Sequence, residues 1–204
     1  MSGDGRAQRH QASRNRILAA TWTIARRRGL GSWSLRDVAD AVGMRPPSLY
    51  VYFDSKSALY DAMFADGYRE LLAIIEATPT DGAPLEVLRR AAHLFFNFSV
   101  ADPARFQLLF LRTLPGFVPS APSYLLAQTV LDKLGEVLRT AGAHSPQQVD
   151  LWTAVFTGLA SQQISNDPGG HRWQRLVNQA VDFLHHAQPP NQLTGDPTLA
   201  HPPP

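Results

Sequence analysis

The stretch SLRDVADAVGMRPPSLYVYFDSKSAL, residues 34–59, limits what this chain can fold into more than any other part of the sequence. Its first half predicts a short amphipathic helix, because apolar residues recur there at helical spacing. These apolar residues are Leu35, Val38, Ala39 and Val42. Ser34 is a helix N-cap residue, and Asp37, three positions later, supplies the carboxylate of a weak capping box.

A tight turn and a second short helix follow this first helix. Gly43 ends the first helix, since glycine readily adopts the left-handed conformation that such a turn needs. Pro46 and Pro47 begin the second helix, where their missing N–H groups would have been unpaired in any case. Two short helices joined in this way form a helix-turn-helix, whose second helix can enter the major groove of DNA.

The turn, the second helix and the segments on either side carry further residues that together form a specific sequence pattern. It consists of Gly43, Met44, Ser48, Leu49, Tyr50, Tyr52, Phe53, Ser55, Lys56, Ala58 and Leu59, with Ile17, Ala20 and Gly29 upstream. This pattern resembles the tetracycline-repressor (TetR) family of bacterial transcription regulators, specifically over residues 14–63 and more weakly to about residue 187. The resemblance implies an all-α fold of about nine helices. In this fold an N-terminal three-helix helix-turn-helix domain precedes a helical domain for effector binding and dimerisation.

The composition along the chain predicts four segments. Residues 1–10 are expected to be a disordered basic arm, and residues 11–58 the helix-turn-helix DNA-binding domain. Residues 59–187 are expected to form the helical effector-binding and dimerisation domain. Residues 188–204 are polar and rich in proline, which predicts a disordered tail.

Charge is distributed unevenly along the chain. Residues 1–56 carry ten basic and four acidic side chains, a net charge of +6, whereas the remainder carries nine basic and thirteen acidic side chains. The whole chain has a net charge of only +2. A basic N-terminal quarter on an acidic body is typical of a DNA-reading head joined to a separate effector domain.

Composition also excludes several classes of protein. The chain has no cysteine, which rules out disulfides, thiolate nucleophiles and cysteine-based zinc sites. No apolar run approaches the ~18 residues of a membrane span, and no signal peptide opens the chain, so we expect a cytoplasmic protein without a membrane partner. The seven histidines fall in no nucleophile, glycine-loop or metal-ligand pattern. We therefore expect no enzyme, no metal and no cofactor.

The DNA-binding surface is expected on and around the second helix of the motif. The predicted contact residues are Arg36, Arg45, Pro46, Pro47, Ser48, Tyr50, Tyr52 and Lys56. By resemblance to the family, the hydroxyl groups and the Lys56 ammonium hold phosphates, which sets the register without reading sequence. Arg45 can bond both O6 and N7 of a guanine, while the prolines can touch only apolar base edges. The alternative for the two tyrosines is packing in the core.

The family commonly carries other residue types at positions 45–47, namely a small hydroxyl residue, then lysine, then glycine or another small residue. Family contacts at these positions therefore do not transfer to Arg45, Pro46 and Pro47.

A homodimer is expected, because one short helix cannot specify a DNA site alone and a symmetric pair can read a palindromic operator. The last two helices each carry an apolar stripe, and two such pairs would form a four-helix bundle. The predicted interface residues are Val149, Trp152, Phe156, Leu159, Gln163, Trp173, Leu176, Val177, Ala180, Val181 and Leu184. The alternative is that Trp152 and Trp173 fill the core of a single chain.

The resemblance also implies that the body binds a small molecule, which tilts the two DNA-binding heads out of register. Aromatic and polar side chains of the body could line an apolar pocket for this effector. The predicted lining consists of Phe95, Phe96, Phe98, Phe106, Phe110, Phe117, Tyr124, Trp152, Phe156 and Gln163, with His93, Asn97, Gln107 and Gln162 as further polar candidates. For each aromatic residue the alternative is ordinary core packing.

Together these features predict a repressor that binds double-stranded DNA at a palindromic operator as a homodimer. A small, largely apolar effector of unknown identity is expected to release it. The alternative is a DNA-binding regulator without a small-molecule ligand, controlled by a partner protein or acting as an activator.

Overall fold

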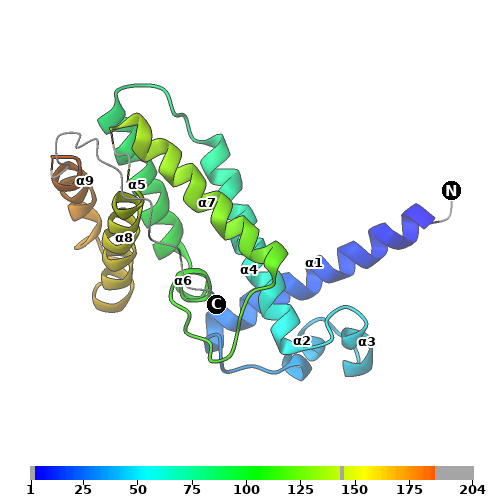
Figure 1. Ribbon diagram of the computed structural model, residues 1–204. Helices are drawn as coiled ribbons and strands as arrows, with labels where there is room; N and C mark the ends of the chain where they lie inside the picture. Colours follow the sequence, from blue (N-terminus) through cyan, green and yellow to red (C-terminus); the bar gives the residue numbers. More distant parts are fainter. Residues whose placement is uncertain (1–2, 143–144, 187–204) are drawn as a thin grey trace.

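The computed structural model describes residues 3–142 and 145–186, and within them every regular element is a helix (Figure 1). The helices are α1 (Gly3–Arg28), α2 (Leu35–Ala41), α3 (Pro46–Tyr50), α4 (Lys56–Ala77), α5 (Pro84–Ala101), α6 (Pro103–Phe110), α7 (Ala121–Thr140), α8 (Pro146–Asn166) and α9 (Val177–His186), with a 3-10 helix, η1 (Gln174–Leu176), before α9. The all-α prediction is confirmed. No helix in the described ranges combines the length and apolar character that crossing a membrane requires.

The N-terminal helix is longer than the sequence pattern predicts. The expectation of a disordered arm over residues 1–10 is wrong for residues 3–10, which form the first turns of α1. Residues 6–12 are rich in alanine, arginine and glutamine, which favour helix, and turns added to an existing helix avoid the cost of nucleation. The expected tail, residues 188–204, lies outside the described residues.

The first three helices and the start of α4 form a head, whose core also takes in Ala104 and Leu108 of α6. Its centre consists of the fully buried side chains Ile17, Val38, Leu49, Leu59 and Met63. Because α4 continues from this core into the rest of the molecule, it joins the head to the body (Figure 1). The expected boundary at residues 58 and 59 falls inside this continuous helix.

The body consists of α4 to α9, with α5 packed against α7, α8 and α9. One body core contains Leu88, Phe96, Phe106, Trp152 and Val181. A second core forms between α4, α5, α6 and α7 around Phe64, Tyr68, Leu71, Phe98 and Leu109. The aromatic residues of α5 and α6 thus divide between two packed clusters.

Hydrogen bonds of side chains also fix the head to the body, in addition to α4 and to the packing of α6 on the head core. Arg26 in α1 donates from Nε to Oδ2 of Asp102, the N-cap of α6, over 2.7 Å. Trp22 Nε1 donates to Asp66 Oδ2 in α4 over 2.9 Å. The Asp61 carboxylate accepts from the Ser120 backbone N–H at the start of α7 over 2.7 Å.

The capping box of α2 forms as predicted. Ser34 accepts a hydrogen bond from the backbone N–H of Asp37, and the Asp37 carboxylate accepts from the Ser34 backbone N–H over 2.7 Å. Hydrogen bonds from Ser34, and then from Arg28, lower the pKa of Asp37 to about 2. The carboxylate therefore stabilises the folded head while it is ionised.

Asp37→Asn should lower the free energy of unfolding at neutral pH, because the amide cannot replace the ionised cap. The folded pKa of about 2 lies below the ordinary value of 3.8, so the contribution is complete above pH ~4 and is lost as pH falls towards 2. Urea unfolding of both proteins at several pH values measures this difference. The prediction requires the difference to shrink between pH ~4 and ~2, and a constant difference would contradict it.

Candidate nucleic-acid interface

The short helix α3 presents most of its surface to solvent. Arg45, its N-cap, is exposed together with Pro46, Pro47 and Ser48. Tyr50 is 52% exposed, and Val51, which follows it, is 72% exposed. The residues expected to read bases are therefore open to solvent.

Leu49 and Phe53 hold α3 on the head. Leu49 is fully buried and Phe53 is 3% exposed, and both belong to the head core. The backbone N–H of Met44 bonds to the Ala39 carbonyl over 2.9 Å, and that of Phe53 bonds to the Leu49 carbonyl over 3.0 Å. A helix of five residues is not stable alone, so this packing determines both its existence and its orientation.

Tyr52 lies between α3 and α1 and is half-buried. Its ring centroid is 4.8 Å from that of His10, and its backbone carbonyl accepts a hydrogen bond from Arg14. The Arg14 guanidinium lies 4.2 Å from the centre of the Phe53 ring. Tyr52 is thus partly a packing residue, and its ring lies beside α1.

Lys56 begins α4 beside the loop between α1 and α2. Its Nζ donates to the Gly31 carbonyl over 3.2 Å and lies 4.5 Å from the centre of the Trp33 ring. Burial lowers the pKa of Lys56 from its ordinary value. The side chain is half-buried, and one of its three ammonium protons is engaged within the chain.

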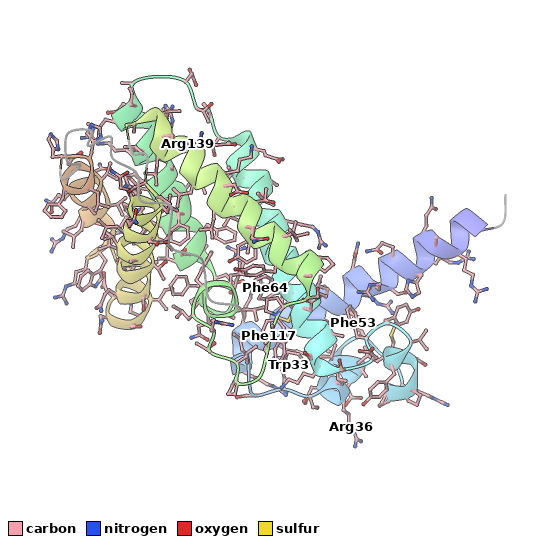
Figure 2. The ribbon with its side chains drawn as sticks, in the orientation of Figure 1. Trp33, Arg36, Phe53, Phe64, Phe117 and Arg139 are labelled. Carbon is pink, nitrogen blue, oxygen red and sulfur yellow. The ribbon has the colours of Figure 1, made fainter. Side chains whose placement is uncertain are left out.

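The remaining arginines of the head divide between structural and exposed positions. Arg26 pairs with Asp102, and Arg28 Nη1 pairs with Asp37 Oδ1 over 2.9 Å. Arg36 is exposed on α2, at the edge of the head away from the body (Figure 2). Two of the three arginines that end α1, Arg26 and Arg28, are therefore engaged in ion pairs within the chain.

The predicted effector residues are distributed over the two body cores. Rings of Phe95 and Phe106 lie 5.1 and 5.7 Å from that of Phe110, and Trp152 packs on Phe156 at 4.8 Å. These rings fill space against one another, as the core alternative predicts. Whether any of them binds a ligand stays a prediction.

Three further predicted residues lie elsewhere. Phe117, in the loop before α7, packs between Tyr60 and Phe64 at the junction of head and body (Figure 2). Tyr124 is 52% exposed on α7. Gln163 is buried and accepts hydrogen bonds at Oε1 from the backbone of η1 and of the residue before it. Gln163 thus holds the connection between α8 and α9.

The predicted dimer surface needs a correction. Six of its residues are buried inside a single chain, where a second copy cannot reach them. They are Trp152, Phe156, Gln163, Val177, Val181 and Leu184. Their apolar stripes face α5, which packs on both α8 and α9, so for Trp152 the alternative of filling the chain's own core is the one observed.

A neighbouring stripe on the same part of the chain is partly exposed. It consists of Leu151, Val155 and Leu159 on α8, Leu176 at the end of η1, and Ala180 and Phe183 on α9, and we call it the outer stripe. Leu151 is 49% and Phe183 is 71% exposed. Leu159, Leu176 and Ala180 of the predicted surface belong to it, and Val149 and Trp173 are half-buried outside it.

Comparison with known proteins supports the assignment of the head. Residues 17–63 match the model of the family described as bacterial regulatory proteins, tetR family. The HTH-type transcriptional repressor KstR2 of Rhodococcus jostii (strain RHA1) is 39% identical over 67 residues, 29% of this chain and 33% of that protein. This chain thus spans one third of the length of that curated relative.

Solved structures match over most of the chain. A regulatory protein of the tetR family from Rhodococcus RHA1 has a TM-score of 0.67 at 20% identity, covering 84% of this chain and 96% of its own. The TetR-family regulator PfmR from Thermus thermophilus has a TM-score of 0.64 at 20% identity, covering 84% and 97%. A tetR-family regulator from Streptomyces coelicolor has a TM-score of 0.68 at 20% identity, covering 85% and 79%.

The structural matches show the fold, and the family model covers the helices that build the exposed face of α3. Over residues 17–63 this chain matches the TetR family of bacterial regulatory proteins, and its fold is that of the TetR-family structures.

Proposed function

We propose that this protein is a transcription repressor that binds a palindromic DNA operator as a homodimer and is released by a small, largely apolar effector. The observation that carries the proposal is the open face of α3, which a fully buried Leu49 holds on the head core. The net charge of +6 over residues 1–56 suits this face to a polyanion.

In this proposal the residues of the face divide between two tasks. Arg45 reads sequence, since a guanidinium can bond O6 and N7 of one guanine in the major groove. Ser48 and Tyr50 hold phosphates and set the register. Lys56, at the start of α4, binds a phosphate with the ammonium protons that do not bond to the Gly31 carbonyl.

Arg45→Ala should relax the base preference at one G·C position in each half-site by ~1–3 kcal/mol. Competition binding with operator duplexes that carry each substituted base pair measures this preference. Arg69→Ala, which removes an exposed arginine of α4, serves as the control and should leave every preference intact. Equal weakening by Arg45→Ala on all duplexes would instead make Arg45 a phosphate contact.

The outer stripe supports the proposed homodimer. It places exposed Leu151 and Phe183 on adjacent helices, and two such helix pairs can pack as a four-helix bundle. Gly158 lies next to the stripe, and a Cβ atom added there would meet open space. Glycine inside a helix costs about 1 kcal/mol relative to alanine, and it permits a close approach of a second backbone.

The double variant Leu151→Glu/Phe183→Glu should convert a dimer into a monomer, because it places charges within an apolar interface. Light scattering after size-exclusion chromatography should give about twice the chain mass of 22.5 kDa for the original protein and one chain mass for the variant. Leu125→Glu on α7, where Leu125 is 60% exposed, is the matched control and should remain dimeric. A dimeric double variant would place the interface elsewhere.

For the effector we propose a hollow between the end of α4, α5 and α9. Its volume is about 670 Å³, within the usual range for small-molecule sites. The lining consists of the apolar residues Ile74, Leu94 and Phe98, the polar residues Thr78, His93, Asn97 and Asn178, and the charged residues Glu86, Arg89 and Arg90. Three of these, His93, Asn97 and Phe98, belong to the residues predicted for the effector.

The chemistry of the hollow suits a largely apolar molecule with one polar end. Leu94 and Phe98 supply apolar surface, while His93 Nε2 lies 2.8 Å from Asn178 Oδ1. Ile74 and Thr78 belong to the end of α4, whose beginning forms part of the head core. A ligand that shifts α4 would favour a different position of the head, typically by ~1–3 kcal/mol of coupling.

Asn97→Trp should fill the hollow from an exposed position and so abolish release by the effector without weakening operator binding. Anisotropy of a labelled operator complex, screened against small amphiphilic compounds, measures release. Gln128→Trp, on the exposed side of α7, is the control and should respond like the original protein. Release that survives Asn97→Trp would move the site to the aromatic cores, and absence of release by any compound would favour a regulator without a ligand.

A further inference from the structure

The first three turns of α1 form a helix that extends past the rest of the head (Figure 1). Residues 6–12 are all exposed. Contact with the head begins at His10, whose ring lies on Tyr52, and at Arg14, which lies over Phe53. The extension therefore gains little stabilisation from burial within the chain.

The extension is basic. Residues 3–13 contain Arg6, Arg9 and His10 against one acidic residue, Asp4, and residues 5–36 as a whole contain eight arginines and no acidic residue. Arg6, His10 and Arg14 follow one another at intervals of four, so they share one face of α1. Because His10 and Arg14 touch residues next to α3, this face also brings Arg6 towards the side of the head that carries α3.

A helix that is polar on all sides buries no face in a core and leaves its charged side chains available to a partner. The charge of this one is complementary to phosphates. We propose that the projecting turns of α1 are a second DNA-contact element, which lies along the phosphate backbone as a rigid helix. This inference rests on the proposed function.

The dimensions of the helix decide which part of the duplex it meets. An α-helix with its side chains is ~10–12 Å wide, and the minor groove of B-DNA is only ~6 Å wide. The extension therefore stays outside the minor groove, where a disordered arm could have entered. Arg6 and Arg9 accordingly contribute affinity without reading sequence.

The position of the extension decides which base pairs it covers. The start of α1 lies on the opposite side of the molecule from α8 and α9 (Figure 1). Because the proposed dimer forms through α8 and α9, both extensions point away from the dimer axis, beyond the outer ends of the operator. Residues 3–13 span ~16 Å, the length of ~5 base pairs.

The experiment compares one operator duplex trimmed to its inverted repeat with the same duplex extended by about ten base pairs of arbitrary sequence at each end, a length that exceeds the reach of the helix. Anisotropy titrations at several salt concentrations give the affinity of the full chain for each. Arg6→Ala/Arg9→Ala removes the charges while keeping a helix-favouring residue. Arg69→Ala/Arg139→Ala removes the same charge from exposed positions on α4 and α7.

The original protein and the Arg69→Ala/Arg139→Ala control should bind the extended duplex more tightly than the trimmed one, whatever the added sequence. Arg6→Ala/Arg9→Ala should bind both equally. On the extended duplex its slope of log affinity against log salt should be smaller by roughly 3–4 units, because each of two subunits loses two phosphate contacts.

A further variant, Ala7→Gly/Ala12→Gly, keeps the arginines and weakens the helix at two exposed positions. This variant should gain less affinity from the added base pairs than the original protein does. An equal gain in affinity would mean that a flexible arm, and not a rigid helix, makes the contact. Equal gains in the original protein and in Arg6→Ala/Arg9→Ala would overturn the inference while leaving DNA binding intact. Absence of binding to both duplexes would overturn the proposed function and this inference with it.

Discussion

Burial of Leu49 is the interaction on which the rest of this structure depends. The five residues of α3 are too few to hold a helix in water, so the helix exists because Leu49, and Phe53 after it, occupy the head core. With this side fixed inwards, Arg45 to Ser48 and Tyr50 are necessarily turned to solvent. One apolar contact thus converts a short polar segment into a rigid projecting surface.

The same requirement for rigidity explains how the head is attached to the body. A reading surface is useful to a regulator only if the body can set its position. Here α4 runs without a break from the head into the body, and the Arg26–Asp102 ion pair links the two as well. Asp102 is 5% exposed and also caps α6, so removal of Arg26 would leave a nearly buried carboxylate without its cation. A shift of α4 or α6 would therefore also move the head, and with it α3.

Local chemistry made much of the fold predictable from the sequence. Ser34, Gly43 and the prolines mark helix ends because each acts through its own backbone geometry or a neighbour within four residues. Long-range contacts gave no such signal. The pairs Arg26–Asp102 and Trp22–Asp66 join residues 76 and 44 positions apart, and no spacing rule connects them.

Periodicity was also a partial guide to which surface is buried. On α8 it correctly identified an apolar stripe through Trp152 and Phe156, but the adjacent stripe through Leu151 and Val155 has the same spacing one residue earlier. Neighbouring residues differ by about 100° around a helix, so sequence alone could not tell the stripe that meets α5 from the one left open. The polar start of α1 escaped prediction for a related reason, because its helix comes from propensity and continuity and carries no apolar pattern.

In the proposed function, two copies of the α3 surface read double-stranded DNA with two-fold symmetry. The most direct measurement is selection of bound duplexes from a pool of random-sequence DNA by the purified full-length chain, followed by sequencing. We expect enrichment of an inverted repeat whose half-site centres lie about one helical turn, ~10 base pairs, or a multiple of it apart. Recovery of no enriched sequence at low ionic strength, or of a single motif without two-fold symmetry, would contradict it.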